Sequence, residues 1–249
     1  MNIFFKKLTA LLDLLAKFFF SLNPICLYRK NRVAPVFHAG IQRSGTNFLC
    51  EIIKNGFCID IINEIDPERD SLFHKHFRIF DQKKLIVMDE QYHNDCIVES
   101  YNDYVKYLNI DNNTKIIVIY KDPINWLLSI KSWSVKCGWV SSDKEFDDVI
   151  WKYLDEYDLY YSKWKELSLK SPDVIKLVQY EVLVENLTEG YVNIGDFLKY
   201  KPVRMWNPAY VNHTGVFKKR IIPPEFKSQD FTSEVYNYIQ FKPELNIYK

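Results

Sequence analysis

One glycine-flanked stretch, residues 33–47, constrains the fold of this chain more than any other. It reads V-A-P-V-F-H-A-G-I-Q-R-S-G-T-N, an apolar run followed by a loop that Gly40 opens and Gly45 closes. A helix is predicted to begin at Thr46 and to end near Gly56, because apolar residues recur there with helical spacing. A loop that joins a strand to a helix N-terminus presents backbone N–H groups to an anion. The stretch therefore predicts a phosphate-binding loop.

This loop departs at one position from the signature of nucleotide-hydrolysing loops, G-x-x-x-x-G-K-[ST]. Gly40 and Gly45 have the spacing of that signature, but Thr46 stands where the lysine belongs. The only fixed cation of the loop, Arg43, lies earlier. Hydrolysis of ATP or GTP needs that lysine on the outer phosphates and a hydroxyl on Mg²⁺. We expect a loop that holds one phosphate without a metal.

A second stretch, residues 115–133, repeats the pattern of strand, turn and helix. It reads K-I-I-V-I-Y-K-D-P-I-N-W-L-L-S-I-K-S-W. The apolar run is typical of a strand buried on both faces of a parallel sheet, and Pro123 suits the first turn of the following helix. Lys121 at the strand end and Ser129, about two turns into that helix, could converge on one anion.

These features together resemble sulfotransferases that use 3′-phosphoadenosine-5′-phosphosulfate (PAPS). The Q-R-S-G-T-N segment resembles the family's 5′-phosphosulfate loop, and Lys121 with Ser129 resembles its R-[DN]-P segment with a serine eight positions after the arginine. Residues 180–184, Y-E-V-L-V, match a third family feature, so the resemblance spans roughly residues 33–200. It implies that PAPS is the co-substrate and that Lys121 and Ser129 hold its 3′-phosphate. Lys121 keeps the charge of the family's arginine but loses its planar fork. The residues that the resemblance implies for the 5′-phosphosulfate are Gln42, Arg43, Ser44, Gly45, Thr46 and Asn47.

Residues 71–80, S-L-F-H-K-H-F-R-I-F, supply the candidate catalytic groups. Sulfuryl transfer to a hydroxyl benefits from a base on the acceptor and a cation near the departing oxygen. The resembling family commonly places a lysine and a histidine together after the first crossover. We therefore predict His76 as the base, with Lys75 and Arg43 as electrostatic support and His74 as the alternative base. The other interpretation is a surface segment whose histidines are only solvated.

The predicted fold is an α/β domain over residues 33–249, with a mainly parallel sheet and helices on both faces, like that of P-loop sulfotransferases. A chain of 249 residues that is 47% hydrophobic can build such a core. Its net charge of +1 indicates no nucleic-acid surface. Beyond the strand of the phosphate loop, the expected strands are Phe57–Ile62, Leu85–Asp89, Lys115–Tyr120 and Val174–Tyr180. The expected helices are Ile97–Leu108, Glu145–Leu167, Glu181–Asn186, Tyr191–Leu198 and Ser233–Phe241.

Residues 1–32 are predicted to form an amphipathic helix and a basic connector. Within residues 1–24 the polar side chains Lys6, Thr9, Asp13 and Lys17 share one face, and apolar residues cover the other. Such a helix could lie in a membrane interface, or pack on the domain or on a second copy, but its charges argue against spanning a bilayer. The expected location is cytoplasmic, peripheral at a membrane, with the Golgi lumen and an N-terminal anchor as the alternative.

The five cysteines are scattered and suggest neither a disulfide framework nor a zinc site, and no metal site is predicted. The expected reaction moves a sulfuryl group from PAPS to an acceptor hydroxyl, on a carbohydrate by the family's habit and the aromatic content of residues 145–167. A lipid, a small phenol or a tyrosine stays open as acceptor, and so does the role of the basic run Lys218, Lys219 and Arg220. The rival functions are an ATP-dependent small-molecule P-loop kinase and a non-catalytic, membrane-associated nucleotide-binding protein.

Overall fold

The computed structural model describes Leu15, Phe18 and residues 22–64, 74–79, 98–205 and 231–241. Several expectations therefore lie outside the described residues. These are most of the N-terminal amphipathic helix, the strand Leu85–Asp89 and the basic run Lys218–Arg220.

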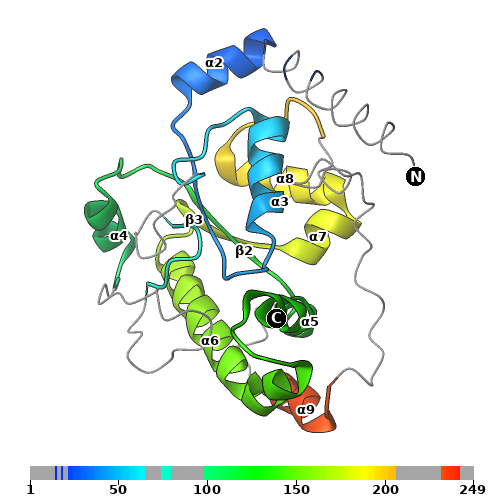
Figure 1. Ribbon diagram of the computed structural model, residues 1–249. Coiled ribbons are helices and arrows are strands. Elements are labelled where there is room, and N and C mark those ends of the chain that lie inside the picture. The colour runs from blue at the N-terminus through cyan, green and yellow to red at the C-terminus, as the bar shows by residue number, and fades with distance from the viewer. Residues whose placement is uncertain are drawn as a thin grey trace.

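A parallel sheet organises the described part of the chain. Its three strands there are β1 (Phe37–Ala39), β2 (Ile116–Tyr120) and β3 (Ile175–Gln179), in the order β1-β2-β3 (Figure 1). Ala39 pairs with Val118, and Tyr120 pairs with Gln179. Every residue of β2 is buried, as its unbroken apolar sequence predicted. Because the strands are parallel, the loops that follow them meet at one edge of the sheet.

Helices cover both faces of this sheet, as predicted, and Figure 1 shows α3 on one side and α6 on the other. The alternation of side chains along the strands separates two cores, because neighbouring residues point to opposite faces. Phe37, Ile116 and Val118 face one core, and Ile117 and Ile119 face the other. The first core packs on α4 (Tyr101–Leu108), α5 (Pro123–Cys137), α6 (Asp143–Lys170) and α9 (Ser233–Phe241). The second packs on α3 (Thr46–Ile52), η1 (Ile53–Phe57), α7 (Tyr180–Glu185) and α8 (Leu187–Leu198).

The two helices that follow β2 begin at side-chain caps. Asp122 caps α5 by accepting hydrogen bonds from the backbone N–H groups of Ile124 and Asn125, at 2.9 and 3.2 Å. Pro123 occupies the first turn of α5, as predicted, where its missing N–H costs nothing. Ser142 caps α6 in the same way. The Asp122 cap fixes where β2 ends and therefore where Lys121 lies.

The prediction of a strand over Phe57–Ile62 is wrong for most of its length. Phe57 closes the π-helix η1, which ends at Cys58 in the left-handed region, at φ 55°. Within that range only Ile61 joins the sheet, through a single parallel bridge to Val36. The helix runs one residue past its predicted end at Gly56, and Arg29 donates a hydrogen bond to the carbonyl of its last residue, Phe57, at 2.8 Å. Apolar runs of this length do not distinguish a strand from the end of a buried helix.

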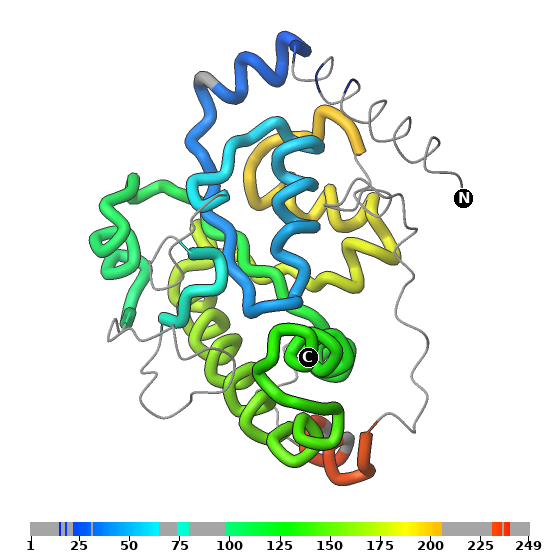
Figure 2. The backbone as a smooth tube through the Cα atoms, viewed as in Figure 1, coloured from blue at the N-terminus to red at the C-terminus, as the bar shows by residue number. Residues whose placement is uncertain are grey.

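The expectation that the cysteines form no disulfide is also wrong. Cys26, in α2 (Pro24–Arg32), is bonded to Cys58, at the end of η1. Arg29 adds to this attachment by stacking over the Tyr200 ring at 5.2 Å. Figure 2 shows α2, in blue, at the end of the molecule where the α3–η1 helix finishes. Pairing between cysteines 32 residues apart depends on tertiary placement, which spacing alone does not reveal.

Candidate active site

Glycine is required at both ends of the phosphate loop. Gly45 has φ 107° and caps α3 without any side-chain hydrogen bond. A Cβ there would lie 2.5 Å from the ring of Tyr180. A Cβ on Gly40 would lie 2.7 Å from the Ile119 carbonyl oxygen. The close-fitting turn leaves the first N–H groups of α3 without side-chain caps, in the arrangement that binds anions at helix N-termini.

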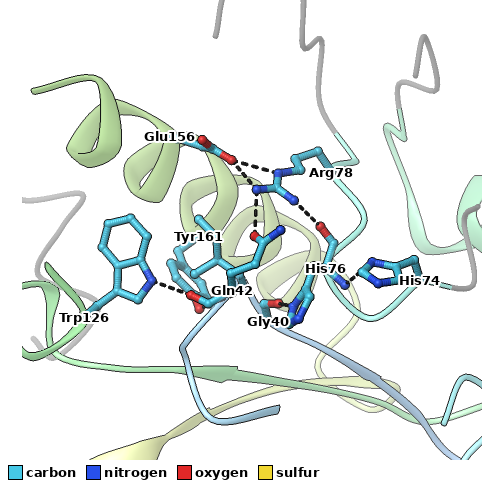
Figure 3. Close-up of polar contacts among 9 residues, drawn as sticks. Gly40, Gln42, His74, His76, Arg78, Trp126, Glu156 and Tyr161 are labelled. Carbon is cyan, nitrogen blue, oxygen red and sulfur yellow. Dashed lines mark hydrogen bonds and ion pairs between the residues drawn. The ribbon is translucent and has the colours of Figure 1, made fainter. Parts of the chain in front are cut away.

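Side chains from distant elements anchor the first half of the loop. The Ile41 N–H donates to the Tyr161 hydroxyl at 3.3 Å, and Trp126 Nε1 donates to the Gln42 carbonyl at 2.7 Å. Gln42 Oε1 accepts a hydrogen bond from Arg78 Nη2 at 2.8 Å (Figure 3). The side-chain oxygen of Gln42 is thus engaged within the protein, and the cofactor role of this residue stays a prediction.

The second half of the loop carries the groups suited to an anion. Arg43 is exposed, has φ 68°, and its guanidinium lies 4.8 Å from the centroid of the Trp133 ring. Ser44 is fully buried, and its hydroxyl lies near that of Tyr161 without completing a hydrogen bond to any described residue. Thr46 and Asn47 form the first turn of α3. A buried hydroxyl, a cation and open amides fit the 5′-phosphosulfate of PAPS.

Lys121 and Ser129 meet, as their spacing suggested. Lys121 Nζ donates to Ser129 Oγ at 3.2 Å, and Ser129 Oγ donates to the Asn125 carbonyl at 2.9 Å. The Lys121 ammonium also lies 4.5 Å from the centroid of the Tyr180 ring. An ammonium and a hydroxyl side by side at the end of β2 suit a phosphate. Their contact with the 3′-phosphate stays a prediction.

The Tyr180–Glu181 pair braces this region from β3. Glu181 accepts hydrogen bonds from the Asp122 N–H at 3.1 and 3.2 Å and from Asn125 Nδ2 at 3.0 Å. Burial raises the pKa of Glu181. Tyr180 contacts the Gly45 turn on one side and Lys121 on the other. The loops after β1 and β2 are therefore fixed against each other by the residues that follow β3.

The His74–Arg78 segment lies against the first glycine of the loop. The Gly40 N–H donates to the Lys75 carbonyl at 3.0 Å, and His76 Nδ1 lies 2.6 Å from the Gly40 carbonyl oxygen (Figure 3). A carbonyl oxygen only accepts, so Nδ1 carries the proton and Nε2 keeps its lone pair. Burial lowers the pKa of His76 well below 6.5. His76 is thus held as a neutral imidazole, which is the form that a general base needs.

The two other candidates of this segment are engaged differently. The Lys75 ammonium donates to Asn47 Oδ1 at the start of α3, which brings its charge to the phosphate loop. His74 Nδ1 accepts the His76 N–H at 3.3 Å, and the two imidazole centroids lie 5.2 Å apart. His76 contacts the loop glycine directly.

Two residues of this site carry no assigned role in the sequence analysis, Arg78 and Glu156. They form a buried ion pair, with side chains 3% and 5% exposed, and Arg78 Nε donates to Glu156 Oε1 at 2.8 Å. A sequence signal for Glu156 does exist. It interrupts the row of tyrosines that faces the core along α6, where a carboxylate needs a partner.

No group of three or more His, Cys, Asp and Glu side chains gathers in metal-binding proximity within the described ranges. The aromatic row of α6, whose residues favoured a carbohydrate acceptor in the sequence, lies mostly in the core. Its fully buried members are Phe146, Tyr153, Tyr157, Tyr160, Tyr161 and Trp164.

Comparison with known proteins identifies the family of this chain. A family model, described as the sulfotransferase domain, matches residues 34–220. The chain belongs to the sulfotransferase family and is a PAPS-dependent enzyme of the P-loop superfamily. No curated protein sequence gives a significant match. Among solved structures, mouse sulfotransferase SULT7A1 complexed with PAP is similar at 15% identity and a TM-score of 0.42, with 79% of this chain and 67% of that chain covered.

Proposed function

We propose that this sulfotransferase moves the sulfuryl group of PAPS to a carbohydrate hydroxyl, with His76 as the general base. The observation that carries the proposal is the hydrogen bond between His76 Nδ1 and the Gly40 carbonyl. It leaves Nε2 unprotonated and fixes the imidazole to the first glycine of the phosphate loop. A base attached directly to the cofactor loop suits a reaction in which acceptor oxygen and sulfur must meet in line.

The cofactor is assigned to two anion sites. The N–H groups at the start of α3 and the Arg43 side chain would hold the 5′-phosphosulfate. Lys121 and Ser129 would hold the 3′-phosphate. Trp133 supports this arrangement, because it lies one turn after Ser129 on α5 and is stacked by Arg43. The two cations thus approach the same face of one helix.

The protein's part in the reaction follows from these positions. PAPS, when bound, supplies an electrophilic sulfur and a phosphate leaving group. His76 Nε2 accepts the proton of the acceptor hydroxyl while its oxygen forms the new O–S bond. The bond from sulfur to the bridging oxygen breaks, and its electron pair stays on the 5′-phosphate of the adenosine bisphosphate product, PAP. Arg43 and Lys75 offset the charge that develops there.

We propose a carbohydrate acceptor because members of the resembling family act on carbohydrates, and because of one local feature. The indole of Trp133 is partly exposed beside Arg43. Sugars pack their apolar faces on such rings.

Transfer of labelled sulfate from PAPS to panels of glycans, phenols and tyrosine peptides tests the function. We expect glycan labelling whose rate Arg43→Ala and His76→Ala each lower about 100-fold or more. Labelling of phenols or peptides alone would overturn the carbohydrate assignment. Binding of PAP without transfer would indicate the nucleotide-binding protein, and Mg²⁺-dependent turnover of ATP would indicate the kinase.

We also propose that the N-terminal segment contacts a membrane surface. Ile25 and Tyr28 are 51% and 64% exposed beside the exposed cations Lys30 and Arg32. Exposed apolar and basic side chains together favour the interface of an anionic bilayer. No described helix is long and apolar enough to cross a membrane. The full chain should sediment with phosphatidylserine vesicles, and failure to do so would remove the proposal.

For the compartment, the Cys26–Cys58 disulfide supports the lumenal alternative over the cytoplasm, because structural disulfides persist in oxidising compartments. Alkylation of the thiols in intact cells before lysis tests this. Protection of Cys26 and Cys58 is expected, and their labelling would restore the cytoplasmic prediction.

A further inference from the structure

We infer that the buried ion pair between Arg78 and Glu156 is a positioning device that holds His76 in register with the phosphate loop. The inference rests on the proposed role of His76 as the base. It assigns a positioning function to two buried residues that are not among the predicted catalytic or cofactor-binding residues.

Arg78 joins three segments that are far apart in the sequence. Its Nε and Nη2 donate to Glu156 Oε1 on α6, and its Nη2 also donates to Gln42 Oε1 in the phosphate loop. Its Nη1 donates to the carbonyl oxygen of His76 at 2.7 Å (Figure 3). One planar guanidinium therefore fixes the base, the loop and a long helix at the same time.

Contacts from Gly40 and Arg78 hold His76 against the phosphate loop at several atoms. The Gly40 carbonyl fixes the His76 ring, and the Gly40 N–H fixes the preceding carbonyl of Lys75. Arg78 fixes the carbonyl of His76 itself and the loop residue Gln42. The imidazole thus has few ways to move relative to the loop.

Stability alone is a poor explanation for this pair. A buried ion pair gains little over apolar residues of the same volume, because both charges lose their hydration. Burial raises the pKa of Glu156, and its Oε2 finds no hydrogen-bond partner among the described residues. Burying this ion pair therefore costs free energy. The remaining hydrogen bonds of Arg78 go to His76 and Gln42, in the two segments that carry the proposed chemistry.

The fork of arginine is needed for this task. A lysine at position 78 would keep the positive charge, but its single ammonium could not reach the His76 carbonyl, Gln42 and Glu156 from one plane. Loss of one anchor would let Nε2 of His76 drift. A displacement of about 1 Å can cost about 100-fold in rate.

The test compares Glu156→Gln and Arg78→Lys with the native enzyme. We expect kcat to fall about 100-fold in each, as for a misplaced base. The dissociation constant for PAP, measured by calorimetry, should rise far less than kcat falls, because the α3 amides, Lys121 and Ser129 are intact. The matched control is Lys131→Met, which removes the ion pair to Asp147 between the neighbouring helices α5 and α6 and should leave kcat unchanged.

The double variant of His76→Ala with Glu156→Gln decides how the pair acts. If the pair works through His76, the double variant has the same kcat as His76→Ala alone. Losses that multiply, or native kcat in Glu156→Gln, would overturn the inference. An unchanged kcat in His76→Ala would instead overturn the proposed base. If Glu156→Gln fails to fold, Arg78→Lys alone decides, because native kcat there overturns the inference.

Discussion

The guanidinium of Arg43 lies over the indole of Trp133, 4.8 Å from the ring centroid. This contact links the loop after β1 to helix α5, which carries Ser129 one turn earlier. Arg43, proposed to hold the 5′-phosphosulfate, is therefore held beside α5, whose Ser129 is proposed to hold the 3′-phosphate. A single nucleotide could bridge the two.

Replacement of Trp133 by alanine should weaken PAP binding about two- to fivefold, because a cation–π contact near the surface is worth about 0.5–1 kcal/mol. Titration calorimetry gives the measurement. Lys136→Ala is the control, because Lys136 also stacks on Trp133, at 5.2 Å, without belonging to the loop. A loss with Trp133→Ala as large as that with Arg43→Ala would contradict a supporting role.

Replacement of Lys121 by methionine should lower the affinity for PAP about 10- to 100-fold, since a hydrogen bond to a charged group is worth about 1.5–3 kcal/mol. Binding of AMP, which lacks the 3′-phosphate, should not change. Lys121→Arg should keep tight PAP binding because the fork suits phosphate. Equal losses for PAP and AMP would show that Lys121 does not contact the 3′-phosphate.

The acid limb of the rate profile should lie well below pH 6.5. Burial lowers the pKa of His76, so the imidazole stays neutral, and able to accept a proton, until the pH falls through that lowered value. Measurement of kcat/KM across the acid range, at a fixed ionic strength, tests this. An acid limb centred at or above pH 6.5 would contradict the assignment of the base.

The fold should lose stability in mild acid through His38. This residue is 1% exposed, its backbone N–H and Nδ1 donate to Asn63 Oδ1 at 3.0 and 2.8 Å, and burial lowers its pKa to about 4. Between pH 6.5 and about 4, His38 is protonated in the unfolded chain but stays neutral in the folded chain. The free energy of unfolding therefore falls as the pH falls. At pH 5 the loss is about 2 kcal/mol. Urea melts at pH 8 and pH 5 should show a smaller loss in His38→Gln, and an equal loss would rule His38 out.

Reduction of the Cys26–Cys58 disulfide should lower the free energy of unfolding by about 2–4 kcal/mol. Urea melts with and without dithiothreitol measure the change, and Cys26→Ser should reproduce it.

The two free cysteines that the structure describes should differ in reactivity. Cys137 is exposed, whereas burial raises the pKa of Cys50 to about 11. Iodoacetamide should therefore modify Cys137 before Cys50, and rapid modification of Cys50 would contradict the burial of its thiol.

The parts of the site that depend on local spacing could be predicted from the sequence. The glycines of the loop, and Lys121 with Ser129, lie within one strand–turn–helix unit each, where period and spacing fix relative positions. Arg78 and Glu156 are 78 residues apart, and their pairing exists only once α6 has packed on the sheet. Two predictions failed for the same reason, the absence of a disulfide and the strand that would begin at Phe57. Both features depend on tertiary contacts.

Tyr180 belongs to neither anion site, yet its ring contacts the Gly45 turn and the Lys121 ammonium. The Tyr180 ring therefore sets the distance between the two proposed anion sites. Selection of a nucleotide with both phosphates would therefore depend on the spacing that the uncharged Tyr180 sets as well as on the charge of Lys121.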